Sequence, residues 1–310
     1  MARVVFKRNF LHPRYWLLWL GLIVLWLLVL LPYKWLRKLG AGFGGIVYYL
    51  AGSRRRIVER NLELCFPEMS AEDRKQITKR NFAAMGIAFA EMAISWWWPK
   101  KRLSKLIKKV EGLEHIQLAQ QEKQGVILLA LHFTTLEIGA AMLATLCPLT
   151  GMYREHGNAF FDYIQRSGRE RMNPESEAIE RDDIRAMARV LKNGETIWYA
   201  PDQDYGAKRS VFVPLFGIPA ATVTATTKFA RLTKAKVIPF VQKPLADGSG
   251  YELIIYPPLD NFPSESEQVD CLIINQWVEK CVKEQIDQYL WAHRRFKTRP
   301  EGEPSLYKKK

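Results

Sequence analysis

The sequence predicts an α/β fold in which helices flank a central, largely parallel β-sheet. The stretch "GVILLALH" (125–132) is almost wholly apolar, as expected for a short strand buried on both faces. Further short apolar runs then alternate with stretches of helical spacing up to the C-terminus. Repeated alternation of strands and helices favours a parallel sheet with helical connections.

Composition points to an anionic partner. The chain has 310 residues, with 46 Lys and Arg against 32 Asp and Glu, a formal charge of +14. Several of its ten tryptophans gather in the first forty residues and at Trp96, Trp97 and Trp98. Indole rings favour membrane interfaces, so anionic lipid is favoured over nucleic acid. Four cysteines without C-x-x-C spacing argue against a disulfide framework or zinc site: Cys65, Cys147, Cys271 and Cys281.

The first element is predicted to be a transmembrane helix. From Tyr15 to Tyr33 the chain carries no charge over nineteen residues, which as a helix would span roughly 28 Å. Basic residues flank the run on both sides, with the larger number after it, which mildly favours a cytoplasmic body. The alternative is a helix lying partly in the membrane interface. We therefore assign residues 1–38 to an N-terminal membrane anchor.

Residues 40–100 are predicted to be helical. Ser70 and Asp73 form a variant of the capping box, apolar residues follow at helical spacing, and Pro99 ends the run. Nothing in the remaining sequence resembles a linker between two globular bodies, so residues 39–310 are predicted to form one domain with this helical first part.

The elements after residue 110 are predicted in turn from their periodicity. A strand is expected at "GVILLALH" and a helix at "LEIGAAMLATL" (136–146). A second helix should cover Asp183–Lys192 and stop before Gly194. The remaining predictions are strands at "TIWYAP", "KVIPFVQ" and "YELIIYP", a helix at "TVTATTKFARLTKA" and a closing amphipathic helix from Val269 to Leu290.

His132 follows the first apolar strand, and Glu137 lies five residues further on. Ligand sites in parallel α/β sheets lie at the carboxyl ends of the strands. If a turn brings the two side chains together, Glu137 can hold one imidazole nitrogen and leave the other as a base. An ordinary polar pair at the end of a strand is an equal alternative from this stretch alone.

Two further segments carry candidate site residues. "YAPDQDYG" places Asp202 and Asp204 just after another predicted strand. "YIQRSGRERMN" carries Arg166 and Arg169, which suit a phosphate or an oxyanion, or else a solvated basic face. The Asp-x-Asp pair also has the form of a metal site in sugar-nucleotide transferases.

Five motifs in order resemble one known family. They are "FLHPRYWL" (10–17), "ERNLELCFP" (59–67), "LHFTTLEIG" (131–139), "APDQDYG" (200–206) and "QYLWAHRRFKTRPEGEPSLY" (288–307). Together they resemble the late acyltransferases of lipid A biosynthesis in Gram-negative bacteria, in particular the lauroyl and palmitoleoyl branch. These are membrane-anchored members of the lysophospholipid acyltransferase group, which carries a motif of histidine, four residues and an acid.

The resemblance implies a fold like that of glycerol-3-phosphate acyltransferase and a reaction without cofactor, metal or covalent intermediate. The donor would be a fatty acyl thioester on acyl carrier protein, and the acceptor a hydroxyacyl chain of Kdo-lipid IVA. His132, held by Glu137, would be the catalytic base, and Arg169 or Arg166 would bind the oxyanion or a substrate phosphate. Asp202, with Asp204, would belong to the acceptor site.

The expected location is the bacterial inner membrane, with the catalytic domain facing the cytoplasm and in contact with membrane phospholipids. Two other functions stay open: a metal-dependent membrane glycosyltransferase that uses the Asp-x-Asp pair, and a membrane-anchored lipid-binding protein without enzymatic activity.

Overall fold

The computed structural model describes residues 5–173, 175 and 178–307. Its α-helices are α1 (Trp16–Leu28), α2 (Tyr33–Leu50), α3 (Gly52–Cys65), α4 (Ala71–Trp97), α5 (Lys100–Leu103), α6 (Leu113–Gln121), α7 (Leu136–Leu143), α8 (Ala159–Glu170), α9 (Ile184–Lys192), α10 (Ala225–Thr233) and α11 (Glu267–Glu284). Its strands are β1 (Ile107–Glu111), β2 (Val126–Leu129), β3 (Thr150–Tyr153), β4 (Ala178–Glu180), β5 (Thr196–Tyr199), β6 (Ser210–Leu215), β7 (Ile218–Val223), β8 (Lys236–Pro244) and β9 (Tyr251–Ile255).

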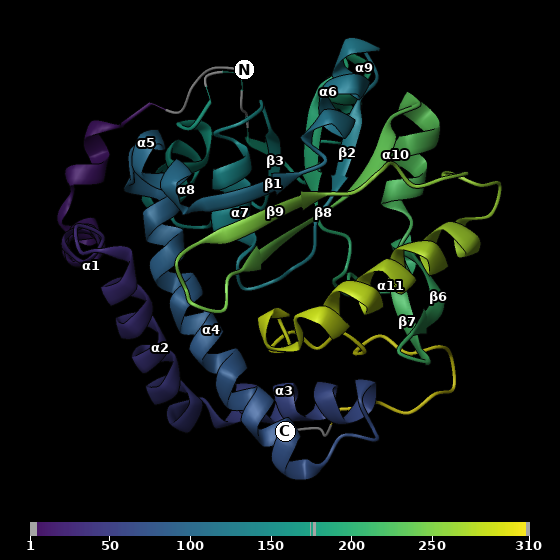
Figure 1. Ribbon diagram of the computed structural model, residues 1–310, viewed down its shortest axis with the longest axis horizontal. Coiled ribbons are helices and arrows are strands. Elements are labelled where there is room, and N and C mark those ends of the chain that lie inside the picture. The colour runs from purple at the N-terminus through teal and green to yellow at the C-terminus, as the bar shows by residue number, and fades with distance from the viewer. Residues whose placement is uncertain (1–4, 174, 176–177, 308–310) are drawn as a thin grey trace.

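The strands form a mostly parallel central sheet, which confirms the predicted α/β class. The strand order is β1-β9-β8-β2-β5-β3-β4, and all neighbours run parallel except β8 and β9. A separate hairpin of β6 and β7 lies beside α11 (Figure 1). The hairpin explains why α10 begins at Ala225, later than predicted: residues 218–223 are taken up by pairing with β6.

Strand β2 is buried on both faces, as its apolar sequence predicts. All four of its residues are buried. Ile127 and Leu129 join the core cluster formed with α9, α10 and α11, whereas Val126 and Leu128 join the cluster formed with α4, α6 and α7. Helices therefore cover both faces of the sheet. The carboxyl ends of its strands are left for a site.

The structure does not support the predicted transmembrane helix over residues 15–33. Helix α1 has 13 residues and ends at Leu28, which at 1.5 Å per residue is about 20 Å, against about 30 Å of hydrocarbon. After it the backbone turns: the indole of Trp98 donates to the carbonyl of Val29 (2.7 Å) and Arg102 donates to that of Leu31 (2.7 Å). Among the described residues, no helix combines the length and apolar composition needed to cross a membrane.

Helix α4 is the long helix that the cap at Ser70 and the stop at Pro99 predict, and it packs closely against α2 (Figure 1). The predicted boundary after residue 38 falls inside α2. Glycines bring the two helices together: a Cβ on Gly44 would lie 2.0 Å from the carbonyl oxygen of Phe82, and one on Gly86 would lie 2.1 Å from that of Gly40. This contact fixes α2 on the body of the protein.

A single methyl group at this contact should destabilise the fold. We expect Gly44→Ala to lower the free energy of unfolding by about 1–3 kcal/mol, since the clash is with backbone and the helices must separate. In Gly42→Ala, the added Cβ would meet nothing within 4 Å. Because alanine forms helices better than glycine, the free energy of unfolding should stay unchanged or rise by up to about 1 kcal/mol. Denaturant titration of both variants measures the free energy of unfolding. Equal changes in the two variants would contradict the close contact between α2 and α4.

Candidate active site

The register of two neighbouring strands brings His132 and Asp202 together. Strands β2 and β5 pair in parallel with Leu129 opposite Tyr199, so the residues three positions beyond each strand meet at the same edge. The backbone N–H of His132 donates to one carboxylate oxygen of Asp202 (2.9 Å), and its ring Nδ1 lies 2.6 Å from the other. The imidazole is thus held by Asp202.

Asp202 fixes the tautomer of the imidazole. Burial by itself would raise the pKa of this carboxyl, but the charge of His132 and the hydrogen bonds to it outweigh burial and hold the pKa below its ordinary value. An ionised carboxylate only accepts hydrogen bonds, so Nδ1 carries a proton. In the neutral ring the other nitrogen, Nε2, is then the basic atom, and His132 lines an open cavity.

Glu137 does not fold back onto His132 as predicted. Its carboxylate accepts from Nε (2.9 Å) and Nη2 (2.6 Å) of Arg169 on α8 and from the indole of Trp96 on α4 (3.2 Å). Burial opposes ionisation of Glu137, but Arg169 and Trp96 together keep its pKa below the ordinary value. The reason is geometric: Glu137 stands in the first turn of α7, beyond the loop that follows β2, and α7 packs against α4, which also contacts α8.

Two neighbouring cavities lie at this site. The outer cavity, of about 980 Å³, is lined by His132, Arg169 and several further polar and basic residues: Tyr153, Arg154, His156, Arg181 and Lys297. A smaller inner cavity, of about 70 Å³, is lined mainly by apolar and small residues, among them Trp96, Ala140, Ala141, Ala144 and Gly151. Both cavities share four lining residues: Leu136, Met152, Arg169 and Trp198. A polar cavity and a mostly apolar cavity therefore lie side by side.

The remaining predicted site residues have other partners. Asp204 lines the outer cavity, yet its carboxylate accepts from the backbone N–H (2.8 Å) and the hydroxyl (2.8 Å) of Thr298. Arg166 pairs with Glu170 (3.4 Å) and stacks over the Tyr153 ring, and it does not line the cavity. Of the two predicted arginines, Arg169 is the one at the site. Asp202 binds His132 whereas Asp204 binds Thr298, so the two carboxylates do not act as a pair.

Two residues of the site were not predicted as site residues, although the tryptophan run was noted. Trp96, from the tryptophan run, is 2% exposed and belongs to the inner cavity. His293 lines the outer cavity, and its Nε2 accepts from the backbone N–H of Asp204 (3.2 Å). Burial, helped by the charges of Lys297 and Arg295, lowers the pKa of His293 to about 4. The stretch "AHRRFK" (292–297), with a histidine beside three basic residues, was the signal by which the sequence could have pointed to His293.

Sequence comparison with known proteins matches the chain to one family. The family described as "Bacterial lipid A biosynthesis acyltransferase" matches residues 3–298. The lipid A biosynthesis lauroyltransferase of Escherichia coli is 45% identical, and the palmitoleoyltransferase of the same organism 42%, each over 97% of this chain and 98% of theirs. The solved structure of the 1-acyl-sn-glycerophosphate acyltransferase of Thermotoga maritima has a TM-score of 0.38 at 14% identity, covering 80% of this chain and 98% of that one.

The low pKa of His293 has a consequence for stability. The unfolded chain takes up this proton near pH 6.5 and the folded protein only near pH 4. The neutral ring therefore contributes stability above pH 6.5, and that contribution is lost as the pH falls toward 4.

We expect wild type to lose more stability between pH 7 and 4.5 than His293→Gln, which keeps an acceptor but does not titrate. The difference should be on the order of 1 kcal/mol, because the ring is partly exposed to solvent. Urea titrations of both proteins at the two pH values measure it. An equal loss in both proteins would show that His293 is readily protonated in the fold.

Proposed function

The chain belongs to the bacterial lipid A biosynthesis acyltransferase family, and we propose that it moves a fatty acyl group from acyl carrier protein to a hydroxyacyl hydroxyl of Kdo-lipid IVA. The observation that carries this proposal is an imidazole held by a buried carboxylate in the wall of a polar cavity, which shares four lining residues with a mostly apolar one. The relatives named as lauroyl- and palmitoleoyltransferases favour a fatty acyl donor of one of these two types.

In the proposed reaction His132 is the general base. Its Nε2 takes the proton of the acceptor hydroxyl while the hydroxyl oxygen attacks the thioester carbonyl. The carbonyl electrons move to oxygen and form a tetrahedral oxyanion. When this collapses, the carbon–sulfur bond breaks, and the leaving thiolate takes the proton back from His132. Asp202 is a positioning residue, because it holds Nδ1–H and stabilises the charged ring without touching the substrate.

Arg169 is proposed to stabilise the oxyanion. Two of its nitrogens are held by Glu137, which leaves Nη1 with its hydrogens for a ligand at the junction of the two cavities. Glu137 therefore serves the reaction through Arg169, in place of the predicted contact with His132. Such a bidentate pair fixes the plane of the guanidinium before the substrate arrives.

The acceptor is proposed to bind in the outer cavity. Kdo-lipid IVA is a phosphorylated disaccharide lipid, and the outer cavity carries Arg154, Arg181 and Lys297 on its walls. Cations at these positions can pair with phosphate groups and orient the hydroxyacyl chain toward His132. The reaction as proposed uses no metal ion or cofactor.

Exposed apolar side chains on α1 and α2 support a location at the bacterial inner membrane. On α2, Trp35, Leu39, Phe43, Ile46 and Leu50 are 51–80% exposed and share one face of the helix. Large exposed apolar faces mark membrane or protein contacts, and such helices lie in the plane of the interface. We propose that this face rests on membrane phospholipids, with the catalytic edge of the sheet toward the cytoplasm.

The inner cavity is proposed to receive the far end of the acyl chain. Its lining is mostly apolar, and Gly151 on β3 faces open space, since a Cβ there would meet nothing within 4 Å. The cavity is small, so its free depth beyond Leu136 and Met152 would set the preferred chain length.

Loss of either member of the His132–Asp202 pair should abolish transfer. In assays with acyl carrier protein thioester and Kdo-lipid IVA, we expect His132→Ala and Asp202→Asn each to lower kcat about 10²–10⁴-fold, because the base is removed or loses its orienting charge. Product is followed by mass spectrometry in the presence of EDTA. Asp260→Asn, at an exposed position outside the lining of both cavities, is the matched control and should retain full activity. Unchanged turnover in His132→Ala, or loss of product with EDTA in wild type, would contradict the proposal.

Filling the inner cavity should change the preferred acyl chain. We expect Gly151→Ala and then Gly151→Val to shift the preference to progressively shorter chains, with about 10–200-fold lower kcat/KM for the chain preferred by wild type. Competition between thioesters of different length, read out by mass spectrometry, measures the shift. Equal loss for all chain lengths would show that Gly151 does not face the acyl chain.

A further inference from the structure

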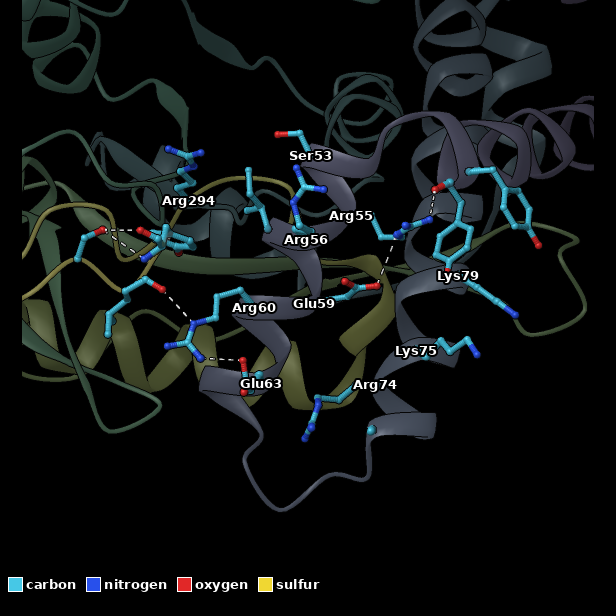
Figure 2. A pocket seen from close by; sticks show the side chains of 17 residues that line it. Ser53, Arg55, Arg56, Glu59, Arg60, Glu63, Arg74, Lys75, Lys79 and Arg294 are labelled. Atoms are coloured by element: carbon cyan, nitrogen blue, oxygen red, sulfur yellow. Dashed lines mark hydrogen bonds and ion pairs between the residues drawn. The ribbon is translucent and has the colours of Figure 1, made fainter. Parts of the chain in front are cut away.

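A second, larger concave surface lies outside the catalytic cavity. This basic groove, of about 1320 Å³, runs between α3 and the first turns of α4 and is bordered by the end of α2 and by the C-terminal segment (Figure 2). Helix α3 contributes Arg55, Arg56 and Arg60, and α4 contributes Arg74, Lys75 and Lys79. Arg55 and Arg56 belong to a run of three arginines at residues 54–56.

The groove has more cationic side chains than carboxylates to pair with them. Its two carboxylates, Glu59 and Glu63, already pair with Arg55 (3.7 Å) and Arg60 (2.7 Å). Arg56, Lys79 and Arg294 form no ion pair with any described residue. Charges of one sign gathered in a concavity attract an oppositely charged partner and speed its association.

The arrangement of the cations suits a protein surface better than a single phosphate or a flat bilayer. In Figure 2 the side chains of Arg294, Lys79 and Arg74 point in different directions along the groove, with no common point between them. A single phosphate needs donors that converge. A flat layer of headgroups would reach the rim of a concave surface but not its floor. A convex acidic helix matches both the shape and the spread of charge.

The groove adjoins the catalytic cavity across a single segment of chain, residues 291–297. Arg294 lines the groove, whereas His293 and Lys297 line the catalytic cavity. Asn61 on α3 donates to the carbonyls of Trp291 (2.7 Å) and His293 (2.8 Å), which holds the segment on α3. Just before it, the N–H of Leu290 donates to the carbonyl of His132 (2.9 Å). A partner seated in the groove would therefore sit beside the reaction site.

We propose that the basic groove is the docking surface for the acidic carrier protein that delivers the acyl thioester. This inference rests on the proposed function, because that function requires a thioester carried by an acidic protein. Docking orients the carrier so that its thioester arm crosses residues 291–297 into the outer cavity. Arg56, Lys79 and Arg294 contribute to recognition of the donor and do not touch the reacting atoms.

The test compares two donors that differ only in the carrier protein. In the triple variant Arg56→Glu, Lys79→Glu and Arg294→Glu, the KM for acyl carrier protein thioester should rise at least about 10-fold, because attraction becomes repulsion. With the corresponding acyl pantetheine thioester, which has no protein surface, kcat/KM should stay within about twofold of wild type. Lys192→Glu is the matched control: Lys192 is exposed at the end of α9, at the opposite end of the molecule from α3 in Figure 1, and should behave as wild type.

Direct binding separates this inference from the proposed function. Fluorescence anisotropy of labelled acyl carrier protein is measured with full-length wild type, the triple variant and Lys192→Glu. If wild type binds the carrier and the triple variant does not, the groove is the docking surface even if no acyl transfer is found, and only the proposed function fails. If wild type transfers the acyl group and the triple variant keeps its KM and its affinity for the carrier, the inference is overturned and the proposed function stands.

Two further results would also overturn the inference. One is an equal loss of activity with both thioesters in a triple variant whose circular dichroism spectrum is that of wild type. The other is unchanged carrier binding together with lost binding to vesicles that contain phosphatidylglycerol, which would make the groove a membrane contact. If the triple variant does not fold, the three single reversals replace it, and each should raise the KM for the carrier thioester several-fold.

Discussion

The parallel register of β2 and β5 is the constraint on which the site depends. Because Leu129 lies opposite Tyr199, the loops that follow these strands leave the sheet side by side and Asp202 meets His132 with both of its oxygens. A buried carboxylate is stable there only because the imidazole and a backbone N–H compensate for its lost hydration. Any shift of one strand against the other would separate the pair and leave Asp202 buried without a partner.

A second set of contacts links this edge to the N-terminal helices. Glu137 on α7, Arg169 on α8 and Trp96 on α4 meet at one point beside the inner cavity. Helix α4 in turn holds α2 through backbone contacts at Gly44 and Gly86. Helix α2, whose outer face is apolar, is therefore joined through the long helix α4 to Arg169, which we propose stabilises the oxyanion.

Three surfaces of the protein suit the membrane, the carrier protein and the reacting groups of the proposed reaction. The apolar face of α1 and α2 suits a membrane, which supplies a lipid acceptor. The basic groove suits an acidic carrier protein, and the polar outer cavity shares lining residues with the mostly apolar inner one. Since the segment 291–297 borders both the groove and the outer cavity, a carrier docked in the groove would lie beside the cavity proposed for the acceptor.

The sequence by itself determined the α/β class, the strand at residues 126–129, the long helix between Ser70 and Pro99, and the location of His132 at a strand end, because hydrophobic periodicity and capping act over short stretches of chain. The family resemblance, given by five motifs, was likewise readable from sequence and is confirmed. Only the tertiary structure decided that Asp202 and not Glu137 holds His132, since strand order in a sheet is not encoded by spacing along the chain. It also decided that the apolar run of residues 15–33 breaks after Leu28, because Trp98 and Arg102, far away in sequence, bind the carbonyls at that turn.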